Sequence, residues 1–278
     1  MRASIPSPAP RRRSVAALLI ACAPAPAMAG APCRLEIAPE PIVALRAIDG
    51  DTLALQDGRE ARLAGVIAPK PPLSVAPAGV WPQADEARAA LDRAAAGRAL
   101  AFRPADKPDR HGRLLGYVAD PAVPDHAGVA TALLEQGRLR VDASRAGRGC
   151  DATLRAAEAS ARRQRLGLWA HSYYEVRQAA DGAGFPADGR FEVAEGRVAS
   201  VRTSGGRVYV NFGRRWRDAL SLSISEPALR RLGGRTALGL EPGAWLRVRG
   251  VVLRGAAGPT IRIDEAAQIE RIDAPEAE

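Results

Sequence analysis

The chain has 278 residues with 40 basic and 31 acidic side chains, a formal net charge of +9. This length predicts two domains, and an apolar content of 47% is enough for buried cores. Nearly all the positive charge is arginine, since the only lysines are Lys70 and Lys107. A basic balance is compatible with a polyanionic partner. After the N-terminal segment no run approaches the ~20 apolar residues of a membrane helix, which excludes a transmembrane span.

Residues 1–29 have the pattern of a signal peptide. Arg11–Arg13 form a positive start, Val15–Ala21 begin an apolar stretch, and Ala27–Ala29 form an A-x-A cleavage site. The pattern predicts an exported protein, located in the periplasm or secreted. An alternative is a lipoprotein, because the residues up to Cys22 resemble a lipobox and would make Cys22 the lipid-bearing N-terminus.

Residues 30–177 predict a first domain of three strands, a helix, two strands and further helices. Asp57-Gly58 is a strong hairpin signal between the second and third strands. This order of elements is that of the OB fold, a small β-barrel that often binds oligonucleotides. The expected strands are 42–48, 53–55, 60–66, 98–103 and 113–118, and the expected helices are 83–96, 129–136 and 152–166 with Asp151 as N-cap.

A glycine- and alanine-rich stretch, 178–190, predicts a linker to a second domain. The second domain, 191–272, repeats the order of three strands, a helix and two strands, which predicts a smaller OB-like β-barrel. The acidic tail 273–278 is expected to be disordered. The fold class is therefore all-β or α+β. The expected strands are 191–203, 207–212, 219–224, 245–254, 260–263 and 268–272, and the expected helix is 226–232.

A possible site begins in the turn Asp49-Gly50-Asp51-Thr52, where two carboxylates could point at a cation. Arg62 follows on the paired strand. Carboxylates, a cation and an arginine are the components of a site that cleaves phosphodiesters. Alternatively, Asp49 and Asp51 only cap the turn, because Asp-Gly-Asp-Thr is a natural turn sequence.

Three segments, "IDGDT", "RLAGVIAP" and "DRHGRLLGYV", occur in this order. Together they resemble the staphylococcal nuclease (thermonuclease) family over roughly residues 40–170. The resemblance implies an SNase-like five-stranded OB barrel with appended helices. It also implies nucleic-acid phosphodiester hydrolysis with Ca²⁺. Asp51 matches the first metal ligand and Asp49 its acidic neighbour, while Arg62 and Arg113 match the two arginines that hold the phosphate.

Two positions depart from the family pattern. Ile67 stands where the second metal aspartate belongs, and Lys70 stands where the glutamate that activates water belongs. Ca²⁺ prefers six to eight oxygen ligands, so the substitution at 67 should weaken its binding. Loss of a general base removes a factor of about 10²–10⁴ in rate. The resemblance therefore predicts a nuclease-family protein whose hydrolysis is weak or absent.

Three hypotheses follow from these departures. An active nuclease would need another metal carboxylate, such as Asp85 or Asp106, and Lys70 would supply charge to the reacting phosphate. A non-catalytic protein would use Lys70, Arg62 and Arg113 as a metal-free pocket for nucleic acid or another polyanion. The third hypothesis is a structural or protein-interaction module of the cell envelope.

Two further features lie outside the possible site described above. Tyr209, Arg214, Arg215 and Trp216 alternate aromatic and basic side chains, which could stack bases and contact phosphates. The alternative is that these aromatics belong to the second barrel and its mouth. Cys33 and Cys150 remain after export and predict a disulfide in an oxidising compartment, with two unrelated thiols as the alternative.

Overall fold

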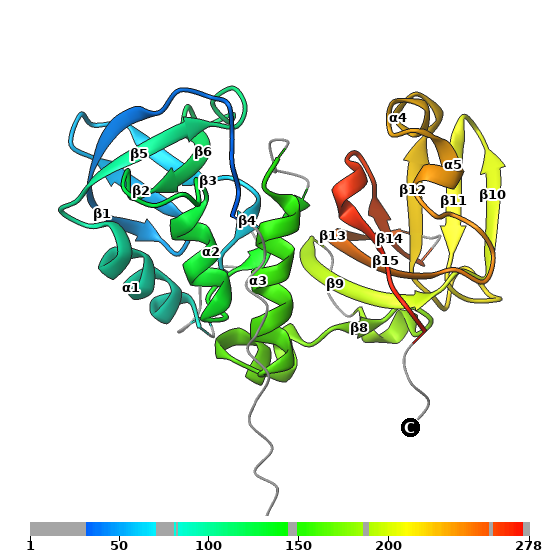
Figure 1. The fold of residues 1–278 in the computed structure, drawn as a ribbon. Coiled ribbons are helices and arrows are strands. Elements are labelled where there is room, and N and C mark those ends of the chain that lie inside the picture. The colour runs from blue at the N-terminus through cyan, green and yellow to red at the C-terminus, as the bar shows by residue number, and fades with distance from the viewer. Residues whose placement is uncertain are drawn as a thin grey trace, which may run out of the picture.

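A computed structural model describes residues 32–70, 81, 83–143, 149–185, 189–255 and 258–274. The expected signal peptide and most of the expected tail lie outside these residues. The described chain has two β-rich domains, with helix α3 lying between them (Figure 1). Among the described residues no helix is long and apolar enough to cross a bilayer.

The first domain is a closed barrel with the strand order β1-β2-β3-β6-β5. Neighbouring strands are antiparallel except β3 and β6, which are parallel. Alternate side chains of β1 point into the core, and Gly58, in the left-handed region at φ 84°, makes the expected turn between β2 and β3. The five-stranded barrel predicted from the sequence is confirmed. Its strands are β1 Glu40–Asp49, β2 Thr52–Leu55, β3 Glu60–Leu63, β5 Ala99–Pro104 and β6 Leu114–Ala119.

Three helices and a short two-stranded sheet are appended to this barrel. Helix α1 buries one alanine- and leucine-rich face, because its apolar residues recur at helical spacing. Helix α3 begins at Asp151 itself, with Cys150 as N-cap and no capping side chain, so the prediction of Asp151 as N-cap was wrong. The appended elements are α1 Ala84–Ala95, α2 Gly128–Glu135, α3 Asp151–Arg163, β4 Val66–Ile67, β7 Arg140–Val141, η2 Gly167–Ala170 and η3 Ser172–Tyr174.

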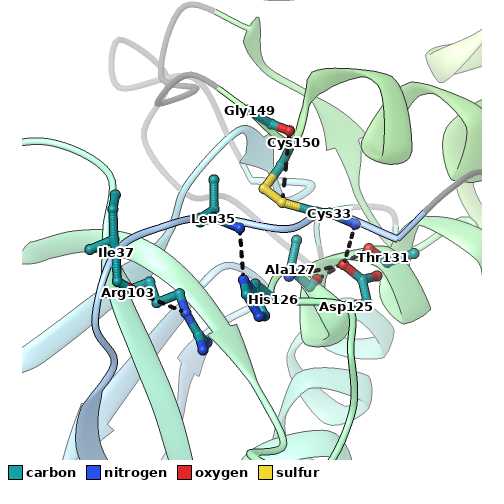
Figure 2. Close-up of a disulfide and its surroundings, with 10 residues drawn as sticks. All are labelled: Cys33, Leu35, Ile37, Arg103, Asp125, His126, Ala127, Thr131, Gly149 and Cys150. Atoms are coloured by element: carbon teal, nitrogen blue, oxygen red, sulfur yellow. Dashed lines mark hydrogen bonds between the residues drawn. A yellow bond between two sulfur atoms is a disulfide. The ribbon is translucent and has the colours of Figure 1, made fainter.

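A disulfide joins Cys33 to Cys150 across 117 positions, as the cysteine count predicted (Figure 2). Both cysteines are buried. The backbone N–H of Cys33 donates to Asp125, and that of Leu35 donates to Nδ1 of His126 at 2.8 Å. The covalent bond and these hydrogen bonds fix the start of the described chain against the beginning of α3.

The second domain contains an eight-stranded sheet with the main order β10-β11-β12-β14-β13-β9-β8, to which β15 adds beside β13. The sheet is not closed, so the closed second barrel expected from the sequence is not confirmed. Strands β12 and β14 are parallel, and Glu226–Arg231 forms the expected short helix with Ser225 as its N-cap. The elements are β8 Arg177–Gln178, η4 Gly182–Gly184, β9 Arg190–Arg197, β10 Ser200–Ser204, β11 Arg207–Asn211, β12 Ser221–Ser225, α4 Glu226–Arg231, α5 Gly234–Ala237, β13 Trp245–Gly255, β14 Gly258–Arg262, η5 Ala266–Gln268 and β15 Ile269–Arg271.

Part of the segment expected as a linker packs onto the second domain. Ala179 and Phe185 are buried in the second core, and β8 pairs with β9. A buried ion pair then joins the two domains: Arg249 of β13 donates to Glu158 of α3 at 2.7 Å, and each side chain is 1% exposed. Glu158 also accepts from the backbone N–H of Val141. The second domain is therefore fixed directly against the helices of the first.

Candidate functional site

The residues predicted to form a site meet at a cleft of about 640 Å³ between the two domains. The first domain contributes the end of β1, strand β3, the chain after β4 and the turn before β6. The second domain contributes β9 and one residue of β13. The lining residues are Asp49, Arg62, Ile67, Ala68, Lys70, Trp81, Asp109, Arg110, His111, Arg113, Arg140, Tyr173, Tyr174, Gly189, Arg190, Phe191 and Val251.

Asp51 lies fully buried beneath the cleft, in the turn between β1 and β2. The preceding Gly50 is required by close packing, since a Cβ there would lie 2.7 Å from Ala87 and 2.8 Å from Ala68. Oδ2 of Asp51 accepts from the Ala68 N–H at 2.8 Å and from Arg62 at 3.3 Å. Burial alone would raise the pKa of Asp51, but the charges of Lys70 and Arg62 outweigh it and hold that pKa well below its usual range.

Lys70 connects both aspartates of the turn. Its Nζ lies 2.9 Å from Oδ2 of Asp49 and 2.9 Å from Oδ1 of Asp51, so an ammonium occupies the space between the two carboxylates. Ile67 also lines the cleft, is half-buried and packs against an apolar cluster that includes Trp169. Lys70 therefore supplies a positive charge at the place where the family resemblance puts a cation.

This donor set does not fit Ca²⁺. The ion prefers several anionic oxygens, yet both aspartates bond to Lys70 and the third expected carboxylate is the aliphatic Ile67. No group of three or more His, Cys, Asp or Glu side chains among the described residues is arranged to hold a metal. Asp85 and Asp106, the carboxylates considered as replacements, do not line the cleft.

Arg113 is positioned by the turn before β6. Its guanidinium donates twice to Oδ2 of Asp109, at 2.8 and 2.6 Å, and both residues line the cleft. Burial would raise the pKa of Asp109, but hydrogen bonds from Arg113 and from the turn backbone outweigh it and lower that pKa to about 2. His111 and the exposed Arg110 stand beside this pair. The arginine matched by the resemblance is thus present, but it is held by an internal carboxylate.

The geometry defines an OB barrel with a basic cleft at the end of its first hairpin. Residues 60–171 match the family model described as Staphylococcal nuclease homologue. Together with the closed five-stranded barrel, this match shows that the first domain has the SNase-like OB fold. A search of curated proteins found no match to the chain.

The sequence did not indicate the far wall of the cleft. Arg140 of β7, Arg190 and Phe191 of β9, and Tyr173 come from segments with no motif, and they meet only because the domains pack together. The guanidinium of Arg190 lies 3.4 Å from the ring centre of Tyr173. Tyr173 in turn packs edge-on against Trp81, with ring centres 5.2 Å apart.

The other predicted nucleic-acid-binding residues lie away from the cleft. Arg214, Arg215 and Trp216 are exposed in the loop between β11 and β12, and Tyr209 is half-buried on β11. The Trp216 side chain is 44% exposed, with the guanidinium of Arg217 at 4.8 Å from its ring. Trp216 therefore does not belong to the core of the second domain.

Proposed function

We propose that this protein binds nucleic acid through the cleft without metal-dependent hydrolysis. The observation that carries the proposal is Lys70 Nζ, at 2.9 Å from a carboxylate oxygen of both Asp49 and Asp51. The ammonium neutralises the two carboxylates that would otherwise attract a divalent cation. As a hydrogen-bond donor to carboxylates, a charged Lys70 cannot also accept a proton from water.

The charge of the cleft supports a polyanionic ligand. Among the described residues, its lining contains six lysine and arginine side chains and two carboxylates, those of Asp49 and Asp109. Arg110 forms no ion pair with any described residue and is exposed, so it can contact a phosphate at little cost in desolvation. Phosphates bound in this way contribute affinity that falls steeply with salt.

The proposal also covers the location of the protein and the architecture of its second domain. The protein is exported, to the periplasm or beyond, or is anchored through Cys22; the Cys33–Cys150 disulfide is compatible with this location. The second domain is an OB-like barrel whose first strand is split into β9 and β10. The backbone N–H groups of Val198 and Ala199 support this, because they bond to Ala244 and Asn211 and continue the pairing across the break.

The test is binding and cleavage of labelled single-stranded DNA and RNA by the mature protein, with Ca²⁺, Mg²⁺, Mn²⁺ or EDTA. The proposal predicts salt-sensitive binding that is the same in all four conditions, with intact strands. Arg110→Ala and Arg113→Ala should each weaken binding, whereas Arg98→Ala, an exposed arginine outside the cleft, should not. Metal-dependent cleavage would identify an active nuclease instead. Absence of both binding and cleavage would favour the third hypothesis, a structural or protein-interaction module of the cell envelope.

A further inference from the structure

Arg140 is a buried cation without a carboxylate partner. Its side chain, in a residue that is 6% exposed, lies between the rings of Tyr174 and Phe191, with its guanidinium 5.1 and 4.9 Å from their centres. Nη1 donates to the backbone carbonyl of Phe191 at 3.0 Å, but the buried Nε has no hydrogen-bond partner among the described residues. No carboxylate of the described chain lies within ion-pair distance of Arg140.

Arg190 stands beside Arg140 on the same wall and is only partly compensated. Its Nε lies 2.7 Å from Glu192, yet neither atom of this pair has an aligned hydrogen bond. Glu192 is also 3.8 Å from Arg177, which pairs with Glu175 at the surface. Among the described residues, the single buried carboxylate of Glu192 therefore faces several arginines on this side of the cleft, and Arg140 has no carboxylate of its own at ion-pair distance.

The two walls of the cleft differ in whether their buried cationic side chains form ion pairs with carboxylates. On the first-domain wall, Arg62 and Lys70 pair with Asp49 and Asp51, and Arg113 pairs with Asp109. On the interface wall, the buried guanidinium of Arg140 has no described carboxylate at ion-pair distance and its Nε has no hydrogen-bond partner there, so a bound anion would stabilise it. Burial lowers the pKa of Arg140, although a guanidinium keeps its charge near neutral pH. The strongest anion position is therefore at Arg140, outside the residues that the family resemblance assigns.

The size of the cleft and the positive charge at Arg140 indicate which kind of anion would bind there. A cleft of about 640 Å³ is of the size that accommodates a small organic molecule, such as one terminal nucleotide of a strand. Trp81 and Tyr173 provide flat rings beside the arginines. A terminal phosphate carries nearly two negative charges near neutral pH, whereas a phosphodiester within a strand carries one. The phosphorylated end of a strand therefore fits both the size of the cleft and the buried positive charge of Arg140.

We propose that the cleft binds the phosphorylated end of a nucleic-acid strand, with the terminal phosphate at Arg140 and Arg190 and the adjoining nucleoside beside Trp81 and Tyr173. This inference rests on the proposed nucleic-acid binding by the same cleft. It assigns to the second domain, through Arg190, a direct part in ligand selection.

The experiment measures binding of one short DNA sequence that carries a 5′-phosphate, a 3′-phosphate or hydroxyls at both ends, in EDTA. One of the phosphorylated strands should bind about tenfold tighter than the hydroxyl-ended strand, the equivalent of one charge-assisted hydrogen bond. Arg140→Met should abolish this preference, and Arg88→Met, an exposed arginine on α1, should retain it. Circular dichroism checks that each variant folds.

A second measurement needs no variant. Inorganic phosphate should displace the phosphorylated strand from the natural protein at concentrations that leave the hydroxyl-ended strand bound at equal ionic strength. Equal affinities for all three strands would overturn this inference and leave the proposed binding function standing. Absence of binding would overturn both. An end preference that persists in Arg140→Met would place the phosphate elsewhere and overturn the assignment.

Discussion

Replacing Lys70 by glutamine removes the charge that neutralises Asp49 and Asp51 and leaves a neutral amide on a side chain one bond shorter. The bond to fully buried Asp51 is charge-assisted and contributes about 1.5–3 kcal/mol. The bond to Asp49 is partly solvated and adds about 0–1 kcal/mol. Lys70→Gln should therefore lower the free energy of unfolding by about 1.5–4 kcal/mol at pH 7.

The pH dependence of this loss gives a sharper test. In the natural chain the pKa of Asp51 is depressed, so its stabilising contribution is present above the unfolded pKa and is lost only as pH falls through the folded pKa. Without Lys70, the strongest of the charges that lower the pKa of Asp51 is lost, so this pKa rises above its value in the natural chain even though Arg62 remains, and Asp51 takes up a proton at a higher pH. The stability difference between variant and natural protein should therefore shrink as pH falls through the pKa that Asp51 has in the variant.

The assay is urea unfolding of both proteins at several pH values, with Lys107→Gln as the control because that lysine is exposed and outside the cleft. The control should change stability by less than about 0.5 kcal/mol. A Lys70→Gln effect as small as the control's, or one that does not vary with pH, would refute the assigned pairing of Lys70 with buried Asp51.

Three other predictions test separate parts of the molecule. Reduction of the Cys33–Cys150 disulfide opens a loop of 117 positions and should cost about 4–5 kcal/mol in chemical unfolding, and an unchanged midpoint would contradict it. Glu158→Ala should cost about 3–5 kcal/mol, while the double change Glu158→Leu and Arg249→Met should cost less, because it removes both buried charges and leaves only neutral groups such as the Val141 N–H without a partner; equal losses in calorimetry would argue against a buried charge pair. If the exposed loop after β11 stacks bases, Trp216→Ala should weaken single-strand binding by about 1–3 kcal/mol, whereas the equally exposed Leu253→Ala should not.

Local patterns predicted the first barrel well because its turns are encoded by adjacent residues. Asp57-Gly58 makes the hairpin between β2 and β3, and Asp49–Thr52 makes the preceding turn. The alternation of apolar residues then fixes which faces are buried, and register follows from the turns. The strand expected over 191–203 is instead interrupted between β9 and β10, and the second sheet is not closed, which no local pattern indicated.

The residues of the cleft likewise differ in whether a local sequence motif predicted them. Asp51, Arg62, Lys70 and Arg113 were found from the sequence because they fall within recognisable motifs of one domain. That Lys70 bonds to both aspartates depends on the path of the chain after β4, which spacing alone does not specify. Arg140 belongs to no motif and becomes a cleft residue only through contact between the domains, so sequence reasoning had no signal for it.

The central claim is that Lys70 has replaced the positive charge of a metal ion. Thermal unfolding of the natural protein with increasing Ca²⁺ tests it most directly, since a bound ion would raise the unfolding temperature by mass action. The combined change Ile67→Asp and Lys70→Glu, which restores the family's carboxylates, is the matched positive control and should acquire a saturable Ca²⁺ shift. The natural protein should show no Ca²⁺ shift, and a saturable shift there would mean that Lys70 has not replaced the ion.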